Sequence, residues 1–382
     1  IYILFNLSNN NIIVFSSFRY NDNSRYLFEY ISRKKTSYKI IWVTNNLKIK
    51  RFLEEKNLNC AYTVFEQLHY ISLAKIAVFS GTKFDDKYSF LRKKTIKYCL
   101  DHGSGNKTTV YFNNSEDNLE YLKKINEIDY FNFCSDFTEN IVGRVAYKFP
   151  NNKIIKLGYP RVDHLFNIRS IGKKKVKNDL IKSIFKDKKD FYKIILYSPT
   201  WKRDKNKNNI LYPLKMINGF KLNKFNKFLK KNNYLLVYTT HPNSQNKDVK
   251  DLSNFKSLNL QENPHLDVNH IIPTVDVLIT DFSTIVTDIL IANKSIILLT
   301  HDHKNFLKNE ALLELSKDII PGKSILSYKE LTTSLKNKNS RFYSEKEKKT
   351  YLAKYYNTQI KNSCGLHKKL LSKLIRNGNY QR

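Results

Sequence analysis

Short apolar runs rich in β-branched and aromatic residues alternate with helical patterns along the first half of the chain. These runs predict strands at Asn11–Ser16, Tyr38–Val43, Ala77–Ser80, Thr95–Leu100, Tyr130–Cys134 and Ile154–Leu157. Helical stretches such as Ser24–Ser32 lie between them. Strands that alternate with helices are typical of βαβ units, which build parallel sheets. The segment Gly158–Arg161 then reads as a turn at a domain junction.

A second and more regular series follows a lysine-rich segment at 169–190. It predicts strands at Lys193–Tyr197, Tyr234–Thr239, Val275–Thr280 and Ser295–Thr300, and helices at Phe220–Lys231 and Ile285–Asn293. The two series are of similar size. We therefore predict an α/β fold with two Rossmann-like domains, residues 1–165 and 166–382, that face a central cleft. The tail, Glu345–Lys373, is helical and amphipathic, and we assign it to the second domain as closing helices that pack back across the first.

Composition narrows the class of protein but does not choose its function. The 382 residues are 41% hydrophobic, which is typical of a globular chain, and 67 basic against 34 acidic residues give a net charge of +33. Such an excess attracts polyanions, including phosphate polymers and anionic lipid, and a solvated surface is its simpler interpretation. The four cysteines form no CxxC pair, which favours a reducing compartment, and no run of about 18 apolar residues predicts a membrane span. The chain begins at Ile1, and we expect a piece of a longer protein.

The sharpest local pattern is DVLITDFSTIVTDILIANKSIILLT at 276–300, a buried-type strand, a polar turn, a helix and another strand. Asp281, Ser283 and Thr284 lie where the strand meets the helix. A hydroxyl there can cap the helix, and free backbone N–H groups at a helix start can bind a pyrophosphate. Ligands in open α/β sheets bind beyond the carboxyl ends of strands. The pattern alone leaves the cap and the phosphate site both open.

Three further segments place polar side chains after predicted strands. In ILYSPTWKRD at 195–204 a strand ends before Pro199, and the residues that follow suit either a nucleotide diphosphate or a surface loop. YLLVYTTHPNS brings a histidine to a strand end, as a phosphate contact or as a structural residue. IKYCLDHGSGNK at 96–107 carries a histidine in a glycine-containing loop. Histidine is the usual general base for a hydroxyl near neutral pH. The residues singled out are Ser198, Thr200, Trp201, Lys202, Arg203, His241, Asp101, His102, Gly103, Ser104 and Lys107. Because these segments come from both halves, they would line the two walls of one cleft.

Taken together, these segments resemble the CDP-glycerol glycerophosphotransferase family, whose members build teichoic-acid-like polymers and some capsules. FSSFRYNDNSRYLFEYI (15–31) resembles the family's opening strand and "DNPR…YEY" helix, and DHGSGNK resembles its "WHGTPLK" loop. IDYFNFCSDFTENIV (128–142) is similar to its "yD…S…" segment, KLGYPRVDHL (156–165) to "GyPRnD", SPTWKRD to "APTWRD", and TTHPN to its "HP" strand end. TDFSTIVTDILIANKSIILLTHD resembles "TDYSSv.fDf…kPiify..D", and IIPGKSI (319–325) the "PG" before the closing helices.

The resemblance implies a GT-B-like fold whose second domain holds the nucleotide donor. It implies His102 as the base and His241 as a phosphate-side group, and we count Asp101 with them as catalytic. Ser283 and Thr284 would bind the donor phosphates, Asp281 would shape their loop, and Gly103, Ser104, Lys107 and Arg161 would lie on the acceptor side. Three departures from the family pattern lie near the acceptor or the donor tail: Asp101 replaces an aromatic residue, Ser104-Gly105 replaces Thr-Pro, and HDHKNFLKNE (301–310) lacks the usual tyrosine and glycine.

The expected function is transfer of a glycerol-phosphate or related unit from a CDP-linked alditol to a hydroxyl of a polymer or lipid-linked acceptor, with release of CMP. We expect the enzyme in the cytoplasm, at the inner face of the membrane, with anionic lipid as a partner. The sequence shows no metal-ligand cluster, assigns no cofactor and leaves Mg²⁺ open. The alternative is a GT-B glycosyltransferase that uses a nucleotide sugar. A nucleic-acid-binding protein is disfavoured because no recognition helix, zinc finger or aromatic RNP motif appears.

Overall fold

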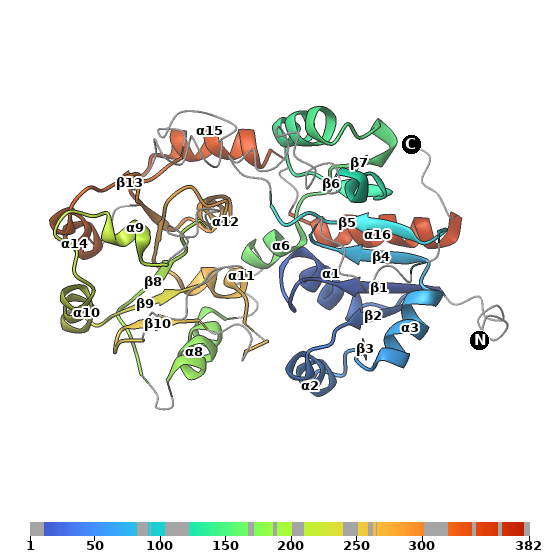
Figure 1. Ribbon diagram of the computed structural model, residues 1–382, viewed down its shortest axis with the longest axis horizontal. Helices are drawn as coiled ribbons and strands as arrows, with labels where there is room; N and C mark the ends of the chain where they lie inside the picture. The colour runs from blue at the N-terminus through green and yellow to red at the C-terminus, as the bar shows by residue number, and fades with distance from the viewer. Residues whose placement is uncertain are drawn as a thin grey trace.

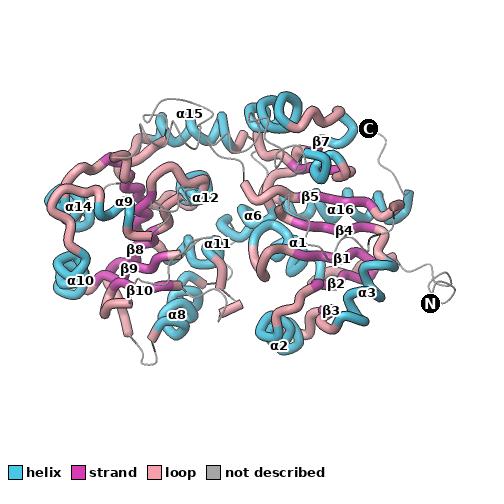
Figure 2. Tube along the Cα trace, in the orientation of Figure 1, coloured by secondary structure: helices cyan, strands magenta, loops and turns pink. Residues whose placement is uncertain are grey.

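The computed structural model describes residues 11–81, 91, 93–103, 122–166, 172–185, 189–200, 210–239, 251–258, 263–264, 266–301, 320–337, 341–357 and 361–377. Within these residues the chain forms two separate parallel sheets, one from each half of the sequence (Figures 1 and 2). The predicted α/β fold class is confirmed.

The first sheet has the strand order β3-β2-β1-β4-β5-β6-β7, and every described pairing in it is parallel. Its strands are β1 (Ile12–Ser16), β2 (Lys39–Val43), β3 (Cys60–Ala61), β4 (Ile76–Phe79), β5 (Ile96–Cys99), β6 (Tyr130–Asn132) and β7 (Ile154–Ile155). The central strands are apolar at successive positions because helices cover both faces of the sheet. Alternate residues therefore enter two different cores.

Helices from the first half of the chain cover both faces of the first sheet. The helical elements of this half are α1 (Asp22–Ser32), α2 (Leu47–Glu55), α3 (Val64–Leu73), α5 (Asp136–Thr138), the π-helix η2 (Glu139–Ala146), the 3₁₀ turn η3 (Asn151–Lys153) and α6 (Pro160–Phe166). Helices α1 and α2 pack on one face, whereas α3 and η2 pack on the other. Helix α6 lies between the two sheets and contacts α1 on one side and α12 (Ile285–Ile291) on the other (Figure 1).

The second sheet has the order β10-β9-β8-β11-β12-β13, again with parallel pairings. Its strands are β8 (Lys193–Tyr197), β9 (Tyr234–Tyr238), β10 (Phe255–Ser257), β11 (Val277–Thr280), β12 (Ser295–Leu298) and β13 (Lys323–Ser324). The accompanying helices are α8 (Lys173–Ile184), α9 (Tyr212–Lys215), α10 (Leu222–Lys231), α11 (Val268–Ile271), the 3₁₀ turn η4 (Ile272–Thr274), α12 and α14 (Tyr328–Lys336). Helices α8, α11 and α12 cover one face, and α9, α10 and α14 the other. Each half is thus a doubly wound Rossmann-like unit.

The tail forms two helices, α15 (Glu345–Tyr355) and α16 (Ser363–Asn377), over the stretch Glu345–Lys373 that was expected to hold the closing helices. Helix α15 packs on the second core through Tyr351 and Tyr355. Helix α16 returns to the first domain, where Leu371 and Leu374 join the core that α1 and β1 also line (Figure 1). The domain boundary at residue 165 stays a prediction. Helix α16 belongs to the second range in sequence, but it packs on the first domain.

The predicted central strands and helices all appear, with ends that differ by at most two residues. The sequence missed β3, β10 and β13, which are two or three residues long and lie at sheet edges. Such short edge strands carry too few apolar positions for a period to show. In the part of the chain that the structure describes, no helix has the length and apolar character needed to cross a membrane.

A buried histidine on α16 makes stability depend on pH. His367 Nδ1 lies 2.6 Å from the Tyr98 hydroxyl and Nε2 lies 3.1 Å from the Gly158 carbonyl oxygen, so the neutral ring fits both partners. Burial lowers the pKa of His367 from 6.5 to about 4. The unfolded chain therefore binds a proton below pH 6.5 that the folded chain excludes, and stability is lost as the pH falls from 6.5 towards 4.

We expect His367 to account for a loss of about 2 kcal/mol in the free energy of unfolding between pH 7.5 and pH 5. Urea unfolding of the wild type and of His367→Gln at both pH values measures this loss. The variant should show a smaller difference between the two pH values, because its side chain does not titrate. Equal differences in both proteins would contradict the assignment.

Candidate active site

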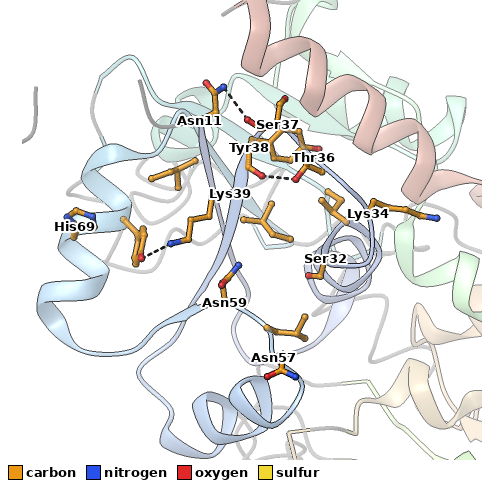
Figure 3. Close-up of a pocket in the computed structure, with 15 residues that line it drawn as sticks. Asn11, Ser32, Lys34, Thr36, Ser37, Tyr38, Lys39, Asn57, Asn59 and His69 are labelled. Carbon is orange, nitrogen blue, oxygen red and sulfur yellow. Dashed lines mark hydrogen bonds between the residues drawn. The ribbon is translucent and has the colours of Figure 1, made fainter. Parts of the chain in front are cut away.

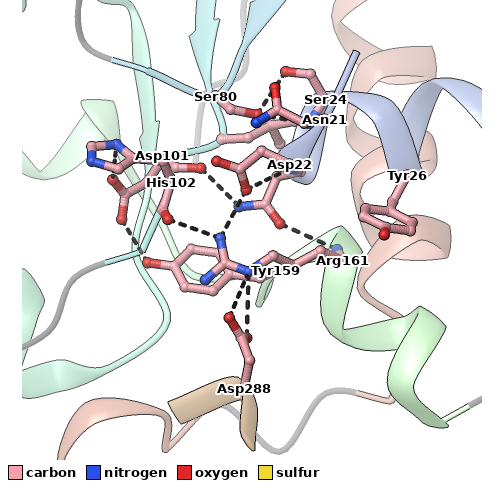
Figure 4. Close-up of polar contacts among 12 residues, drawn as sticks. Asn21, Asp22, Ser24, Tyr26, Ser80, Asp101, His102, Tyr159, Arg161 and Asp288 are labelled. Carbon is pink, nitrogen blue, oxygen red and sulfur yellow. Dashed lines mark hydrogen bonds and ion pairs between the residues drawn. The ribbon is translucent and has the colours of Figure 1, made fainter. Parts of the chain in front are cut away.

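The loop after β5 carries Asp101, His102 and Gly103 at the carboxyl edge of the first sheet. Asp101 is buried, and its backbone has the left-handed φ of 59° that non-glycine residues rarely adopt. Its Oδ2 accepts a hydrogen bond from the Tyr159 hydroxyl at 2.5 Å, and its carbonyl oxygen accepts one from Asn23 Nδ2 at 2.7 Å (Figure 4). Hydrogen bonds to both the side chain and the backbone of Asp101 therefore hold the loop in place.

His102 is the exposed member of this loop, with 59% of its side chain accessible. Its Nδ1 lies 3.6 Å from Asp101 Oδ1, which is beyond hydrogen-bond length but within the range that tightens when a substrate binds (Figure 4). A carboxylate beside one ring nitrogen stabilises the imidazolium and leaves the other nitrogen for a substrate proton. The pair can therefore serve as an oriented general base, and both residues were predicted from the sequence.

Arg161 approaches this loop from α6, and it is buried. Its Nη1 donates to the His102 carbonyl oxygen at 2.9 Å and to Asp22 Oδ1 at 2.8 Å, and its Nε lies 3.2 Å from Asp288 Oδ2 (Figure 4). Burial alone would lower the pKa of Arg161, but the Asp288 and Asp22 carboxylates hold that pKa well above its ordinary value. The structure turns the Arg161 guanidinium into the protein, and its expected place on the acceptor side stays a prediction.

On the second domain, the predicted donor segments meet at the carboxyl edge of the sheet. Asp281, which follows β11, accepts a hydrogen bond from the Thr200 backbone N–H at 2.7 Å, and Thr280 donates its hydroxyl to the Ser198 carbonyl oxygen at 2.7 Å. The Thr200 hydroxyl oxygen is buried without a hydrogen-bond partner among the described residues. The loop after β8 is therefore fixed against the loop after β11, and the predicted role of both loops in donor binding stays a prediction.

Ser283 and Thr284 lie between β11 and α12 and are partly exposed. Thr284 occupies the cap position, but its side chain makes no capping hydrogen bond, contrary to the cap that the sequence suggested. Helix α12 has 7 residues, so it is shorter than the helix predicted to 293. The contribution of these two hydroxyls to phosphate binding stays a prediction.

Several candidate residues lie outside the described part of the chain: Trp201, Lys202, Arg203, His241, Ser104 and Lys107. Their predicted roles stay predictions. Strand β9 ends at Tyr238, and the Thr239 hydroxyl lies 3.4 Å from the Ser198 hydroxyl, so the strand that precedes His241 ends beside the donor segment.

Sequence reasoning missed four residues that build the site: Asp22, Asn23, Tyr159 and Asp288. A signal for them existed, because they lie in the segments NDNSR, GYPR and TDFSTIVTD that carry the family resemblance. Their roles could not be read there, because each acts on a partner that is distant in sequence.

An open cavity of about 700 Å³ lies elsewhere, at the amino ends of β1 and β2 (Figure 3). Its lining includes Asn11, Lys34 and Lys39, and Lys39 Nζ donates to the Tyr70 hydroxyl at 3.0 Å. Because amino and carboxyl ends of parallel strands lie at opposite edges, this cavity is remote from Asp101 and His102. Among the described residues, no group of three or more His, Cys, Asp or Glu side chains is arranged to hold a metal ion.

Two Rossmann-like domains, with the Asp101–His102 loop on one and hydroxyl-bearing loops on the other, form an architecture of the GT-B type. A solved structure of the wall teichoic acid polymerase TagF has the same fold, with a TM-score of 0.75 over 98% of this chain and 92% of that chain, at 20% sequence identity. Residues 2–364 match the model of the CDP-Glycerol:Poly(glycerophosphate) glycerophosphotransferase family, and the chain belongs to this family.

Two curated relatives show how the chain compares in length. The teichoic acid poly(glycerol phosphate) polymerase of Staphylococcus epidermidis is 26% identical over 296 residues, which is 72% of this chain and 38% of the relative. The teichoic acid glycerol-phosphate primase of Bacillus subtilis is 27% identical over 208 residues, which is 53% of this chain and 48% of the relative. The chain thus spans less than half the length of either relative.

Proposed function

We propose that this chain transfers a glycerol-phosphate, or related alditol-phosphate, unit from a CDP-linked donor to a hydroxyl of a cell-surface polymer or lipid-linked acceptor. The observation that carries the proposal is the Asp101–His102 pair, which is held at the carboxyl edge of the first sheet in a chain of this family. Relatives named as polymerases and as a primase support polymer synthesis as the process.

In the proposed reaction, His102 accepts the proton of the acceptor hydroxyl as the oxygen attacks the β-phosphorus of the donor. The bond between that phosphorus and the bridging oxygen breaks, a new phosphodiester forms, and CMP leaves with the bridging oxygen. Phosphoryl transfer needs alignment and charge stabilisation more than covalent chemistry. Ser198, Thr200, Ser283 and Thr284 would hold the diphosphate, with Asp281 fixing the position of their loops.

Identification of the released nucleotide tests this function. The protein is incubated with CDP-glycerol, CDP-ribitol and common nucleotide sugars, with and without Mg²⁺, in the presence of a glycerol-phosphate-primed acceptor. Release of CMP from a CDP-alditol, with growth of the acceptor, is the expected result. Release of UDP or CDP instead would assign the chain to the glycosyltransferases, and absence of CMP release with every CDP-alditol would contradict the proposal.

We also propose that the enzyme works at the inner face of the membrane as a peripheral protein. The start of α3 presents Val64 and Phe65, whose side chains are 69% and 86% exposed. Helix α2 lies against Tyr62, two residues before Val64, since Lys50 Nζ is 5.6 Å from the centre of the Tyr62 ring. Lys50 pairs with Glu54, and α2 adds exposed Lys48. Apolar side chains flanked by cations suit an anionic lipid surface.

Replacement of both Val64 and Phe65 by serine should reduce co-sedimentation with vesicles that contain phosphatidylglycerol by about tenfold, because two apolar side chains no longer enter the lipid. The matched control is Tyr192→Ser, which removes a 58% exposed aromatic side chain from the second domain. Equal vesicle binding by both variants and the wild type would exclude this surface.

A further inference from the structure

Arg161 occupies the junction of the two domains. It lies on α6, which contacts α1 of the first domain and α12 of the second. Its guanidinium bridges one carboxylate from each: Asp22 at the start of α1, and Asp288 on α12. The same Nη1 that binds Asp22 also donates to the carbonyl oxygen of His102. One side chain therefore joins both domains to the catalytic loop (Figure 4).

The catalytic loop is shaped around this guanidinium. Gly103 has a φ of 113°, and a Cβ at this position would lie 2.8 Å from Arg161 Nη2. The guanidinium also lies 4.6 Å from the centre of the Tyr159 ring, whose hydroxyl holds Asp101. A glycine here thus permits the close approach of Arg161 to the loop backbone.

Two aspartates of the network have strained backbones. Asp101 and Asp22 have φ values of 59° and 61°, in the left-handed region. Asn23 joins them, because its Nδ2 donates to the Asp101 carbonyl oxygen while its Oδ1 accepts from the Arg161 backbone N–H at 3.2 Å. Such conformations persist only where the surroundings over-determine them, and they cluster at functional sites. The polar network supplies those surroundings.

The connection also reaches the donor side. Asp288 lies one turn along α12 from Thr284, the residue expected to bind donor phosphate. A shift of α12 on donor binding would move the Asp288 carboxylate, and Arg161 would transmit that movement to the His102 carbonyl. A planar guanidinium can bind these three acceptors together, whereas a lysine ammonium on a flexible stem cannot hold the same geometry.

We propose that Arg161 is a positioning residue that sets the placement of His102 and couples it to the donor-side helix α12 through Asp288. This inference rests on the proposed function for its kinetic readout. It gives Arg161 a role distinct from acceptor binding, because the side chain acts through the backbone of the catalytic loop.

The test compares Arg161→Lys, Asp288→Asn and a control, Arg144→Lys, in CMP release, in donor affinity by calorimetry and in amide hydrogen exchange of the peptide 96–103. Arg144 also pairs with a carboxylate, Glu139, but its side chain is 41% exposed, and its helix η2 packs on the face of the first sheet opposite α1. We expect Arg161→Lys to lower kcat about 100-fold with the donor Kd within about threefold, since a displacement of about 1 Å costs roughly this much. Asp288→Asn should lower kcat about tenfold. The amides of peptide 96–103 should exchange faster in both variants than in the wild type. Arg144→Lys should match the wild type in all three measurements.

Unchanged kcat in Arg161→Lys, or a donor affinity that falls in proportion to kcat, would overturn the proposal. If Arg161→Lys does not fold, Asp288→Asn decides by the same criteria. If the wild type releases no CMP, the proposed function fails, and hydrogen exchange then decides alone. Equal protection of 96–103 in wild type and Arg161→Lys would overturn the positioning role, whereas faster exchange in the variant would support it.

Discussion

His102→Ala is expected to lower CMP release by about 10²- to 10⁴-fold while the affinity for the CDP-linked donor stays within a few-fold of the wild type. The substitution removes the base but not the groups expected to bind the diphosphate, which lie on the other domain. Because the imidazole is 59% exposed and lies 3.6 Å from Asp101, its loss should leave the fold intact. Steady-state CMP release, calorimetric donor titration and thermal melting measure these three properties.

A matched control is His69→Ala, which removes an exposed histidine of α3 at the rim of the remote cavity and should leave turnover unchanged. Loss of donor binding together with the melting transition in His102→Ala would show a structural role for this histidine. Full turnover in a folded His102→Ala variant would exclude it as the base.

Asp163→Ala is expected to destabilise the first domain by about 3 kcal/mol. The buried Asp163 carboxylate accepts hydrogen bonds from the backbone N–H groups of Ser363 at 3.0 Å and Cys364 at 2.7 Å, at the start of α16. Without the carboxylate, two buried donors lose their partners, and the helix that brings Leu371 and Leu374 into the first core is held less firmly. Urea unfolding at pH 7.5 measures the change in the free energy of unfolding.

The control is Ser327→Ala, which removes the side chain that accepts the Glu330 backbone N–H at 3.2 Å at the partly exposed start of α14. A cap of this kind contributes about 1 kcal/mol, because water can replace it. If Asp163→Ala cost no more than Ser327→Ala, the return of α16 to the first domain would not depend on this carboxylate.

The sequence determined the elements and the place of the chemistry. The spacing of apolar residues predicted the central strands and the α/β class, because each central strand is a continuous apolar run. Parallel topology then required the residues after those strands to gather at one edge of each sheet. Asp101 and His102 could be named on this ground, and the structure places them at that edge beside each other.

Only the tertiary structure decided which of these residues face solvent and which act on one another. Arg161 meets Asp22 across 139 positions and Asp288 across 127, and no local pattern encodes such pairs. Its burial follows from the packing of α6 between two domains. The placement of α16 on the first sheet is likewise set by Asp163 and by complementary apolar faces. Short-range periodicity specifies an element, whereas long-range contacts depend on how elements pack, and the packing appears only in the folded chain.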